Sequence, residues 1–269
     1  MHRRTITIPC YNEASRLDVS RVRTYLGGAP LTTLVFVNDG STDSTLALLY
    51  NLRRETPYQV HVLDLPRNGG KAEAVRQGLL YGIRDLSAEV VGFWDADLAT
   101  PLEAIDDFDA VLERRPDIDM VFGSRVRLLG RQIERKLTRH YFGRLFATCA
   151  SLVLDLPIYD TQCGAKLFRV TPQLTQVLES PFRSRWIFDV EMIARFIRAY
   201  RAVAKPAGTW IYEFPLHAWI DVAGSKVRIV DFLRAGIELA LIWRQHTICA
   251  PQCSSDRVMA AAAAHADRH

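Results

Sequence analysis

Stretches typical of β-strands alternate with stretches typical of helices along the first 124 residues, and this alternation restricts the fold more than any other feature. The strand-like stretches are apolar, rich in β-branched and aromatic residues, and bounded by turn-forming residues; they lie at 5–9, 33–38, 59–65, 90–95 and 120–124. Helical patterns fill the intervals, at 15–26, 44–54, 71–83 and 102–114. Such alternation is typical of βαβ units, so we expect an α/β fold with a mostly parallel sheet flanked by helices.

The second half of the sequence has longer helical patterns and fewer strands. We expect helices at 133–154, 188–200 and 226–244, with strands within 160–170 and 208–214. The sequence contains no internal repeat and no linker, so residues 1–248 are predicted to form a single domain. The Ala-rich segment 249–269 is predicted to be a disordered tail.

Composition and charge exclude several classes of protein. With 49% hydrophobic and 24% charged residues the chain is neither disordered nor fibrous. Its longest apolar run, 145–154, is too short to cross a bilayer, and no signal peptide precedes the first strand, so we expect a cytoplasmic protein. The net charge is only +4, but the positive charge is concentrated within 125–144. This run is either a solvated helix face or a site for an anionic partner; we expect no nucleic acid.

Two acidic residues follow the fourth predicted strand. Asp95 and Asp97 come directly after the apolar residues 90–94. Because ligand sites of open α/β sheets lie at the carboxyl ends of the strands, both carboxylates are expected to face one crevice. Carboxylate oxygens suit a hard divalent cation such as Mg²⁺ or Mn²⁺, whose coordination shell phosphate oxygens would then complete. Taken alone, however, the pair is more simply explained as a helix cap and a solvated turn.

The second and third predicted strands also end in polar, glycine-containing loops. In Asn38-Asp-Gly-Ser-Thr-Asp43 the carboxylate of Asp39 can accept hydrogen bonds from a nucleobase or ribose. In Asn68-Gly-Gly-Lys71 the paired glycines let backbone amides approach an anion, and Lys71 adds a positive charge at a helix N-terminus. Each loop alone is also explained as a turn, but several such loops at one sheet edge indicate a nucleotide-diphosphate site.

Taken together, these loops resemble family 2 glycosyltransferases with the GT-A fold. The resemblance rests on four stretches of the first half: Ile8-Pro-Cys-Tyr-Asn-Glu13, Val37-Asn-Asp-Gly-Ser-Thr-Asp43, Asn68-Gly-Gly-Lys71 and Asp95-Ala-Asp-Leu-Ala-Thr-Pro101. Four features of the second half are similar to the dolichyl-phosphate β-glucosyltransferase branch and related polyprenyl-phosphate sugar transferases: Gly123-Ser-Arg125, Asp160-Thr-Gln-Cys-Gly-Ala-Lys-Leu-Phe168, Arg185-Trp-Ile-Phe-Asp-Val-Glu191, and Trp219 with Gly224-Ser-Lys226.

The resemblance implies a function for each half of the domain. Residues 1–124 would bind a nucleotide-sugar donor and residues 125–248 a lipid-phosphate acceptor, and the sugar would be transferred with inversion. It implies that Pro9, Tyr11, Glu13 and Asp39 hold the nucleoside, with Lys71 near the base or the diphosphate. It implies that Asp95 and Asp97 hold Mg²⁺ or Mn²⁺ on the diphosphate.

On the acceptor side, the resemblance makes Arg125 and Lys166 candidates for the acceptor phosphate, with Asp160 and Asp189 bordering acceptor and sugar. Asp160 is a general base, an anchor for a sugar hydroxyl, or a residue that orients Arg125, and these three roles stay open. For Asp189, a buried ion pair with a nearby arginine is an equal alternative. A phosphate acceptor is already ionised at neutral pH, since its second pKa is about 6, so it needs cationic positioning more than a base.

Four functions remain as alternatives. The first is transfer of glucose from UDP-glucose to a polyprenyl or dolichyl phosphate. The second is the same fold acting on GDP-mannose, or on a glycan or protein hydroxyl. The third is a nucleotidyltransferase, which the loop 9–13 disfavours because it lacks the usual Gly-rich, basic character. The fourth is an inactive nucleotide-sugar-binding protein, which the intact Asp39, Asp95 and Asp97 disfavour.

A lipid-phosphate acceptor would require contact with a membrane. The helix predicted at 133–154 combines an apolar stripe with Arg135, Lys136 and Arg139, and the final helix 226–244 is also amphipathic. Such a helix either covers the sheet or lies in the membrane interface. We therefore expect peripheral binding on the inner face of the plasma membrane, directly or through a membrane partner protein.

Overall fold

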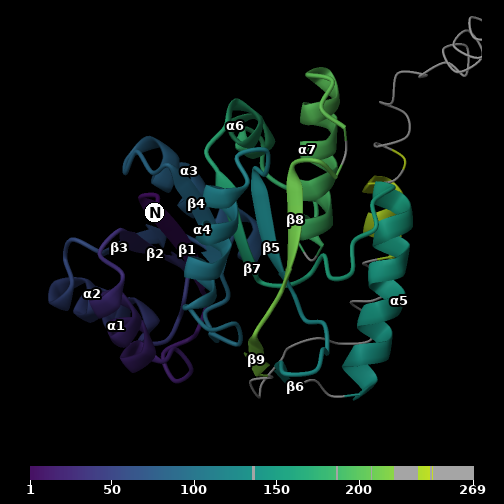
Figure 1. Cartoon of the computed structure of the whole chain (residues 1–269). Coiled ribbons are helices and arrows are strands. Elements are labelled where there is room, and N and C mark those ends of the chain that lie inside the picture. The colour runs from purple at the N-terminus through teal and green to yellow at the C-terminus, as the bar shows by residue number, and fades with distance from the viewer. Residues whose placement is uncertain (135–136, 186, 207, 221–235, 243, 245–269) are drawn as a thin grey trace, which may run out of the picture.

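The protein is built around a seven-stranded sheet with helices on both faces (Figure 1). The computed structural model describes residues 1–134, 137–185, 187–206, 208–220, 236–242 and 244. The strand order is β3-β2-β1-β4-β7-β5-β8. The seven strands span Arg4–Cys10 (β1), Thr32–Asp39 (β2), Val60–Leu65 (β3), Val90–Trp94 (β4), Met120–Ser124 (β5), Ala165–Arg169 (β7) and Ile211–Pro215 (β8).

The first half of the sheet is parallel, which confirms the fold class predicted from the sequence. β1 pairs in parallel with β2 and with β4, and β2 pairs in parallel with β3. Four helices connect these strands and β5: Val19–Gly28 (α1), Thr45–Glu55 (α2), Lys71–Arg84 (α3) and Ala104–Arg114 (α4). The first begins later than predicted, because Asp18 caps it by accepting a hydrogen bond from the amide of Arg21.

Two separate hydrophobic clusters cover the two faces of the sheet. On one face, α1 and α4 pack against side chains such as Ile6, Phe36 and Trp94. On the other face, α3 and the helices of the second half pack against Phe93 and Phe168. Both faces of the central strands are therefore buried, which explains why their sequences read as continuous apolar runs rather than as an alternation.

The second half inserts an antiparallel strand into the sheet. β7 pairs antiparallel with β4 on one side and with β5 on the other, and β5 pairs in parallel with β8. The helices of this half are Leu137–Leu154 (α5), Pro172–Leu178 (α6) and Phe188–Ala202 (α7). Because β7 joins the strands of the first half, the two halves share one sheet.

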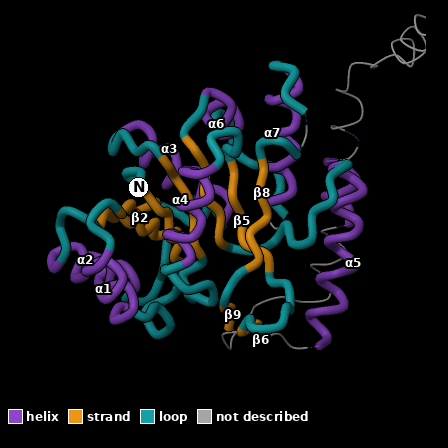
Figure 2. The backbone as a smooth tube through the Cα atoms, in the orientation of Figure 1, coloured by secondary structure: helices purple, strands orange, loops and turns teal. Residues whose placement is uncertain are grey.

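A small second sheet corrects the start of the helix predicted at 133–154. Residues Gln132–Glu134 form a strand, β6, which pairs in parallel with Ala218–Ile220, β9. Ile133 lies opposite Trp219 in this ladder, so the chain is extended there and α5 begins at Leu137. Both short strands lie beyond the carboxyl ends of the main sheet, at the bottom of the view in Figure 2.

Parts of the predicted C-terminal structure fall outside the described residues. Of the helix expected at 226–244, residues 236–242 and 244 are helical and the rest is not described. The tail predicted at 249–269 and the residues Arg135 and Lys136 also lie outside. Among the described helices, none combines the length and the apolar character that spanning a bilayer requires.

Candidate active site

The polar residues singled out in the sequence gather at the carboxyl ends of neighbouring strands. Pro9 is the penultimate residue of β1 and pairs with Val37 of β2, and Asp39 is the last residue of β2. Asp95 follows β4, and Arg125 follows β5. Since β1, β2, β4, β5 and β8 run in the same direction, these positions share one edge of the sheet. This is the edge where open α/β sheets bind their ligands.

Asp39 organises the glycine loop that follows β3. Its Oδ1 accepts a hydrogen bond from the amide of Gly69 at 2.7 Å, and its Oδ2 accepts one from Gly70 at 2.9 Å. Burial raises the pKa of the Asp39 carboxyl above its ordinary value, although these amides oppose the shift. The glycine loop 68–71, which was predicted to bind phosphate, is therefore held in place by the carboxylate of Asp39, which was predicted to bind the nucleobase or ribose.

Gly40 is required for the same close approach. Its φ is +65°, and a Cβ at this position would lie 2.6 Å from the amide nitrogen of Asn68. Only glycine fits, because any side chain would be both strained and in contact with backbone. The second and third loops can thus touch without an intervening side chain.

The loop after β1 is joined to the loop after β2 by hydrogen bonds that the sequence did not reveal. Asn12, which has a φ of +54°, accepts from the amide of Thr42 at 2.8 Å and donates its own amide to Ser41 Oγ at 3.0 Å. Glu13 donates its amide to Thr45 Oγ1 at 2.9 Å and forms an ion pair with Arg16 at 3.3 Å. Tyr11 is 39% exposed, which leaves the ring accessible to a ligand.

The two acids after β4 lie next to a lysine from α3. Lys71 Nζ is 2.5 Å from Asp95 Oδ1, and Asp97 Oδ2 is 4.0 Å from Arg16 Nη2. Burial lowers the pKa of Lys71, but the carboxylates of Asp95 and Asp189 outweigh it, so the pKa is raised overall. Burial and the nearby charge of Asp95 both raise the pKa of Asp97.

Asp95 and Asp97 fit a divalent cation. They offer hard carboxylate oxygens at the end of a buried strand, and their mutual repulsion, visible in the raised pKa of Asp97, is what a cation between them would relieve. Gly164 also keeps space for Asp95, since a Cβ on Gly164 would overlap Asp95 Oδ2. Phosphate oxygens of a diphosphate would have to supply further ligands.

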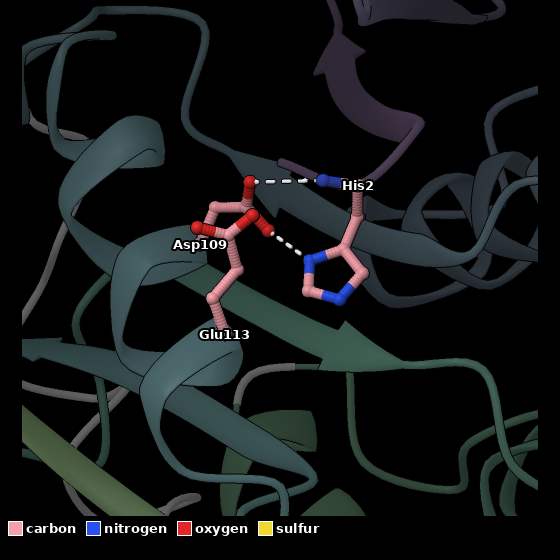
Figure 3. A group of neighbouring side chains, drawn as sticks. All are labelled: His2, Asp109 and Glu113. Carbon is pink, nitrogen blue, oxygen red and sulfur yellow. Dashed lines mark hydrogen bonds and ion pairs between the residues drawn. The ribbon is translucent and has the colours of Figure 1, made fainter.

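A second group of possible ligands lies elsewhere and is explained by ion pairing. Figure 3 shows His2, Asp109 and Glu113 around the first residues of the chain. His2 Nδ1 is 2.5 Å from Asp109 Oδ1, and Asp109 Oδ2 is 3.4 Å from Arg4 Nη1. These contacts attach the N-terminal residues to α4 at the edge of the sheet where β1 begins, far along the strand from the predicted site.

Arg125 and Asp160 form a bidentate ion pair on the acceptor side. Arg125 Nε is 2.6 Å from Oδ2 and Nη2 is 2.7 Å from Oδ1, while the Arg125 amide donates to Oδ2 at 3.2 Å. The guanidinium also lies over the ring of Trp219, 5.3 Å from its centroid. Burial opposes the charge on Arg125, but the Asp160 carboxylate outweighs burial and raises the pKa of Arg125.

Lys166 is placed differently from the acceptor contact that the resemblance implies. Its side chain is fully buried in β7, and Nζ donates to the carbonyl groups of Thr161 and Cys163 at 3.0 and 2.6 Å. It forms an ion pair with Asp189 Oδ1 at 2.9 Å. This burial argues against direct contact with an acceptor phosphate and indicates that Lys166 attaches α7 to the loop 160–164. The predicted buried pair of Asp189 exists, but with a lysine rather than an arginine.

Two residues near the site were not assigned a role from the sequence. Glu213 of β8 accepts the amides of Tyr159 and Asp160, at 2.9 and 2.7 Å, and so fixes the position of Asp160. Arg185 donates to the carbonyl of Gly69 at 3.3 Å and lies beside Gly70, which adds a second positive charge at the glycine loop. A single acid within an otherwise apolar predicted strand was the available signal for Glu213.

The α/β fold, with polar loops gathered at the carboxyl ends of its parallel strands, is that of a GT-A glycosyltransferase, and comparisons with known proteins agree. Residues 5–172 match the family model described as glycosyl transferase family 2, so the chain belongs to that family. A dolichyl-phosphate β-glucosyltransferase of Trichomonas vaginalis is 28% identical over 250 residues, covering 88% of this chain and 70% of the relative. A dolichyl-phosphate β-glucosyltransferase of Drosophila melanogaster is 29% identical over 270 residues, covering 93% and 77%.

Solved structures share the fold at lower identity. Glucosyl-3-phosphoglycerate synthase from Mycobacterium tuberculosis, crystallised with Mn²⁺ and UDP-glucose, superposes with a TM-score of 0.63 at 16% identity, covering 91% of this chain and 79% of that enzyme. The same enzyme with UDP gives a TM-score of 0.63 at 15% identity, covering 93% and 82%. This similarity confirms the predicted GT-A fold.

Proposed function

We propose that this glycosyltransferase transfers a hexose, glucose from UDP-glucose, to the phosphate of a polyprenyl or dolichyl lipid with inversion at the sugar carbon. The names of the relatives support this choice, since they are dolichyl-phosphate β-glucosyltransferases at 28% and 29% identity over most of the chain. The arrangement of Arg125 and Asp160 supports a phosphate acceptor independently of those names.

The donor would bind along the loops after β1, β2 and β3. Pro9, Tyr11, Glu13 and Asp39 are proposed to hold the nucleoside, with the Gly69 and Gly70 amides beside it. Lys71 is proposed to move from Asp95 to the diphosphate when the donor enters, because both are anions and the lysine side chain is flexible.

Asp95 and Asp97 would hold Mg²⁺ or Mn²⁺ against the diphosphate. When bound, such a cation stabilises the negative charge that develops on the leaving diphosphate. Lys71 would add a positive charge on the same leaving group from α3. Arg16 Nη2 lies 4.0 Å from Asp97 Oδ2 and partly offsets the effect of burial and of Asp95 on the pKa of Asp97.

The observation that carries the proposal is that both oxygens of Asp160 are bonded to Arg125. A carboxylate used in this way orients the guanidinium and is a poor general base, so the site suits an acceptor that needs no deprotonation. A phosphate monoester is ionised at neutral pH, whereas a sugar hydroxyl requires a base within hydrogen-bond reach. Arg125 would therefore bind the acceptor phosphate, and Asp160 would hold Arg125 in place.

A lipid acceptor also requires that the protein reach a bilayer. We propose peripheral binding to the cytoplasmic face of the plasma membrane, either directly or through a membrane partner protein. The concentration of basic residues within 125–144 supports an anionic surface as the partner.

The test is a donor and acceptor screen with product analysis by mass spectrometry. UDP-glucose, other UDP-sugars and GDP-mannose are each incubated with Mg²⁺ or Mn²⁺ and either polyprenyl phosphate or a free saccharide. We expect hexosyl-phosphoryl-polyprenol from UDP-glucose, and no product with Asp97→Asn protein. Preferred use of GDP-mannose would overturn the donor, and transfer only to a saccharide hydroxyl would overturn the acceptor.

A further inference from the structure

A turn next to the acceptor side presents two leucines to solvent. Leu128 is 48% exposed and Leu129 is fully exposed. The turn is closed by a hydrogen bond from the Arg131 amide to the Leu128 carbonyl at 3.1 Å, and Gly130 has a φ of +80°. A Cβ at Gly130 would meet no other atom within 4 Å, so the space beside this glycine is open.

This turn carries positive charge beside its apolar tip. The tip is preceded by the exposed Arg127, and no acidic residue occurs between 125 and 133. Arg131, which follows the tip, is only partly exposed and interacts electrostatically with Asp107 of α4. The chain continues into β6, whose partner strand β9 ends at Ile220, another half-exposed apolar side chain. Isolated apolar side chains are ordinary on a protein surface, but two neighbouring exposed leucines beside an exposed arginine form an amphipathic tip.

The turn lies at the edge of the molecule where the acceptor would enter. It begins two residues after Arg125, whose guanidinium contacts Asp160 and Trp219. β6 and β9 lie beyond the carboxyl ends of the main strands, at the bottom of Figures 1 and 2. A flat surface that touched this tip would therefore lie near the residues proposed to bind the acceptor phosphate.

We propose that the turn 127–131 docks the enzyme on an anionic lipid bilayer. Leu128 and Leu129 enter the boundary between headgroups and acyl chains, while Arg127 contacts the lipid phosphates. Charge complementarity selects this partner, because an apolar tip beside an exposed arginine matches an apolar interior beneath a negatively charged surface. The inference rests on the proposed function, since it supplies the contact that a membrane-embedded acceptor phosphate requires.

The first experiment measures co-sedimentation with vesicles of phosphatidylcholine, with and without phosphatidylglycerol. We expect the full-length chain to bind the anionic vesicles, and binding to weaken as salt rises. Leu128→Ser/Leu129→Ser should weaken it at least ~10-fold, because both apolar contacts are lost. Arg127→Gln should weaken binding to anionic vesicles and reduce its salt dependence.

Leu31→Ser is the matched control. Leu31 is 42% exposed, similar to Leu128, but it precedes β2 and so lies at the opposite edge of the sheet. This variant should bind vesicles like the parent protein. In addition, Leu129→Trp should show a blue-shifted tryptophan emission relative to its vesicle-free spectrum when anionic vesicles are added.

The outcomes separate this inference from the proposed function. If Leu128→Ser/Leu129→Ser binds vesicles like the parent protein and Leu129→Trp shows no shift, the docking inference is wrong, whatever acceptor is used. If the parent protein self-associates through the turn and ignores vesicles, a second copy is the partner and the inference is overturned. If vesicle binding depends on the turn but no prenyl phosphate accepts sugar, the proposed function fails and the docking surface stands.

Activity with two acceptors provides a second readout. A short, water-soluble prenyl phosphate needs no bilayer, so Leu128→Ser/Leu129→Ser should use it as well as the parent protein does. Transfer to a long polyprenyl phosphate in vesicles should fall in that variant. Equal loss with both acceptors would indicate damage to the active site and would contradict a docking role.

Discussion

Lys71 of α3 forms an ion pair with Asp95, with its Nζ 2.5 Å from Oδ1. Asp95 is one of the two carboxylates that a metal would use. The same lysine is also 5.9 Å from the centroid of the Phe188 ring at the start of α7. The ion pair neutralises part of the acidic cluster in the protein without donor. We therefore expect binding of a metal to Asp95 to be coupled to departure of Lys71, with a diphosphate favouring both by attracting the lysine.

The first prediction concerns this coupling. Lys71→Met should bind Mn²⁺ several-fold more tightly than the parent protein in the absence of nucleotide, because a half-exposed ion pair no longer competes. The same variant should bind UDP more weakly, since one positive charge is missing. Calorimetric titration with MnCl₂ and with UDP measures both.

A distant ion pair of similar length provides the control for Lys71. Lys205 Nζ is 2.7 Å from Asp119 Oδ2, and both residues lie away from the acidic pair. Lys205→Met should leave both affinities unchanged. Unchanged Mn²⁺ affinity in Lys71→Met would show that Lys71 does not compete with the metal.

The second prediction is that activity depends on a divalent metal held by Asp95 and Asp97. Asp97→Asn should lower turnover at least ~10²-fold, the scale on which one preorganised charge acts. Asp117→Asn, which alters an exposed aspartate paired with Arg115, is the control and should be fully active. Initial rates are measured with Mg²⁺, with Mn²⁺ and with excess chelator, and full activity in chelator would contradict the prediction.

Local sequence patterns were sufficient for most of the first half and for the donor side. Apolar runs ending in polar loops predicted β1 to β5, and the acids at the end of β4 were predicted to lie together with the loops of Asp39 and Lys71. These features depend on short-range sequence alone, because parallel strands bring their carboxyl ends to one edge whatever the details of packing.

The second half depended on contacts between distant residues, which one sequence does not reveal. β7 was predicted as a strand, but its antiparallel insertion between β4 and β5 was not. Lys166 lies in a central strand covered on both faces, so it is buried although alternation within its segment permits an exposed position. Its partner Asp189 is on α7, and only the tertiary structure pairs them. Likewise, pairing of β6 with β9 keeps residues 132–134 extended, so the helix predicted to begin at 133 begins at Leu137.

The third prediction assigns Arg125 to the acceptor. Arg125→Ala should raise the KM for polyprenyl phosphate while leaving the affinity for UDP nearly unchanged. Asp160→Asn should show the same pattern in a weaker form, since it loosens the guanidinium without removing it. Steady-state kinetics over both substrates and UDP calorimetry separate the effects, and a collapse of UDP binding in Arg125→Ala would move this residue to the donor side.

The fourth prediction follows from the raised pKa of Asp39. Its carboxylate accepts the amides of Gly69 and Gly70, and a proton on it would place an O–H donor against these N–H donors. Because burial raises the pKa above 3.8, protonation begins at a higher pH than for an ordinary aspartate. UDP affinity measured without metal should therefore weaken as pH falls toward this raised pKa, and the effect should be absent in Asp39→Ala, which binds UDP weakly at every pH. Parallel pH profiles would contradict the role of Asp39.

The fifth prediction concerns the buried ion pair of Lys166 and Asp189. Removing one member leaves the other charge buried without this counter-ion, whereas removing both leaves no buried charge, only the Thr161 and Cys163 carbonyls without the lysine donor. Lys166→Met should therefore lower the free energy of unfolding by about 3–5 kcal/mol, and Lys166→Met/Asp189→Leu should recover much of that loss. Urea unfolding of the parent protein, both single variants and the double variant gives the coupling energy. Additive losses would show that the two charges do not stabilise each other across β7 and α7, and the arrangement of α7 beside the loop 160–164 would then need another explanation.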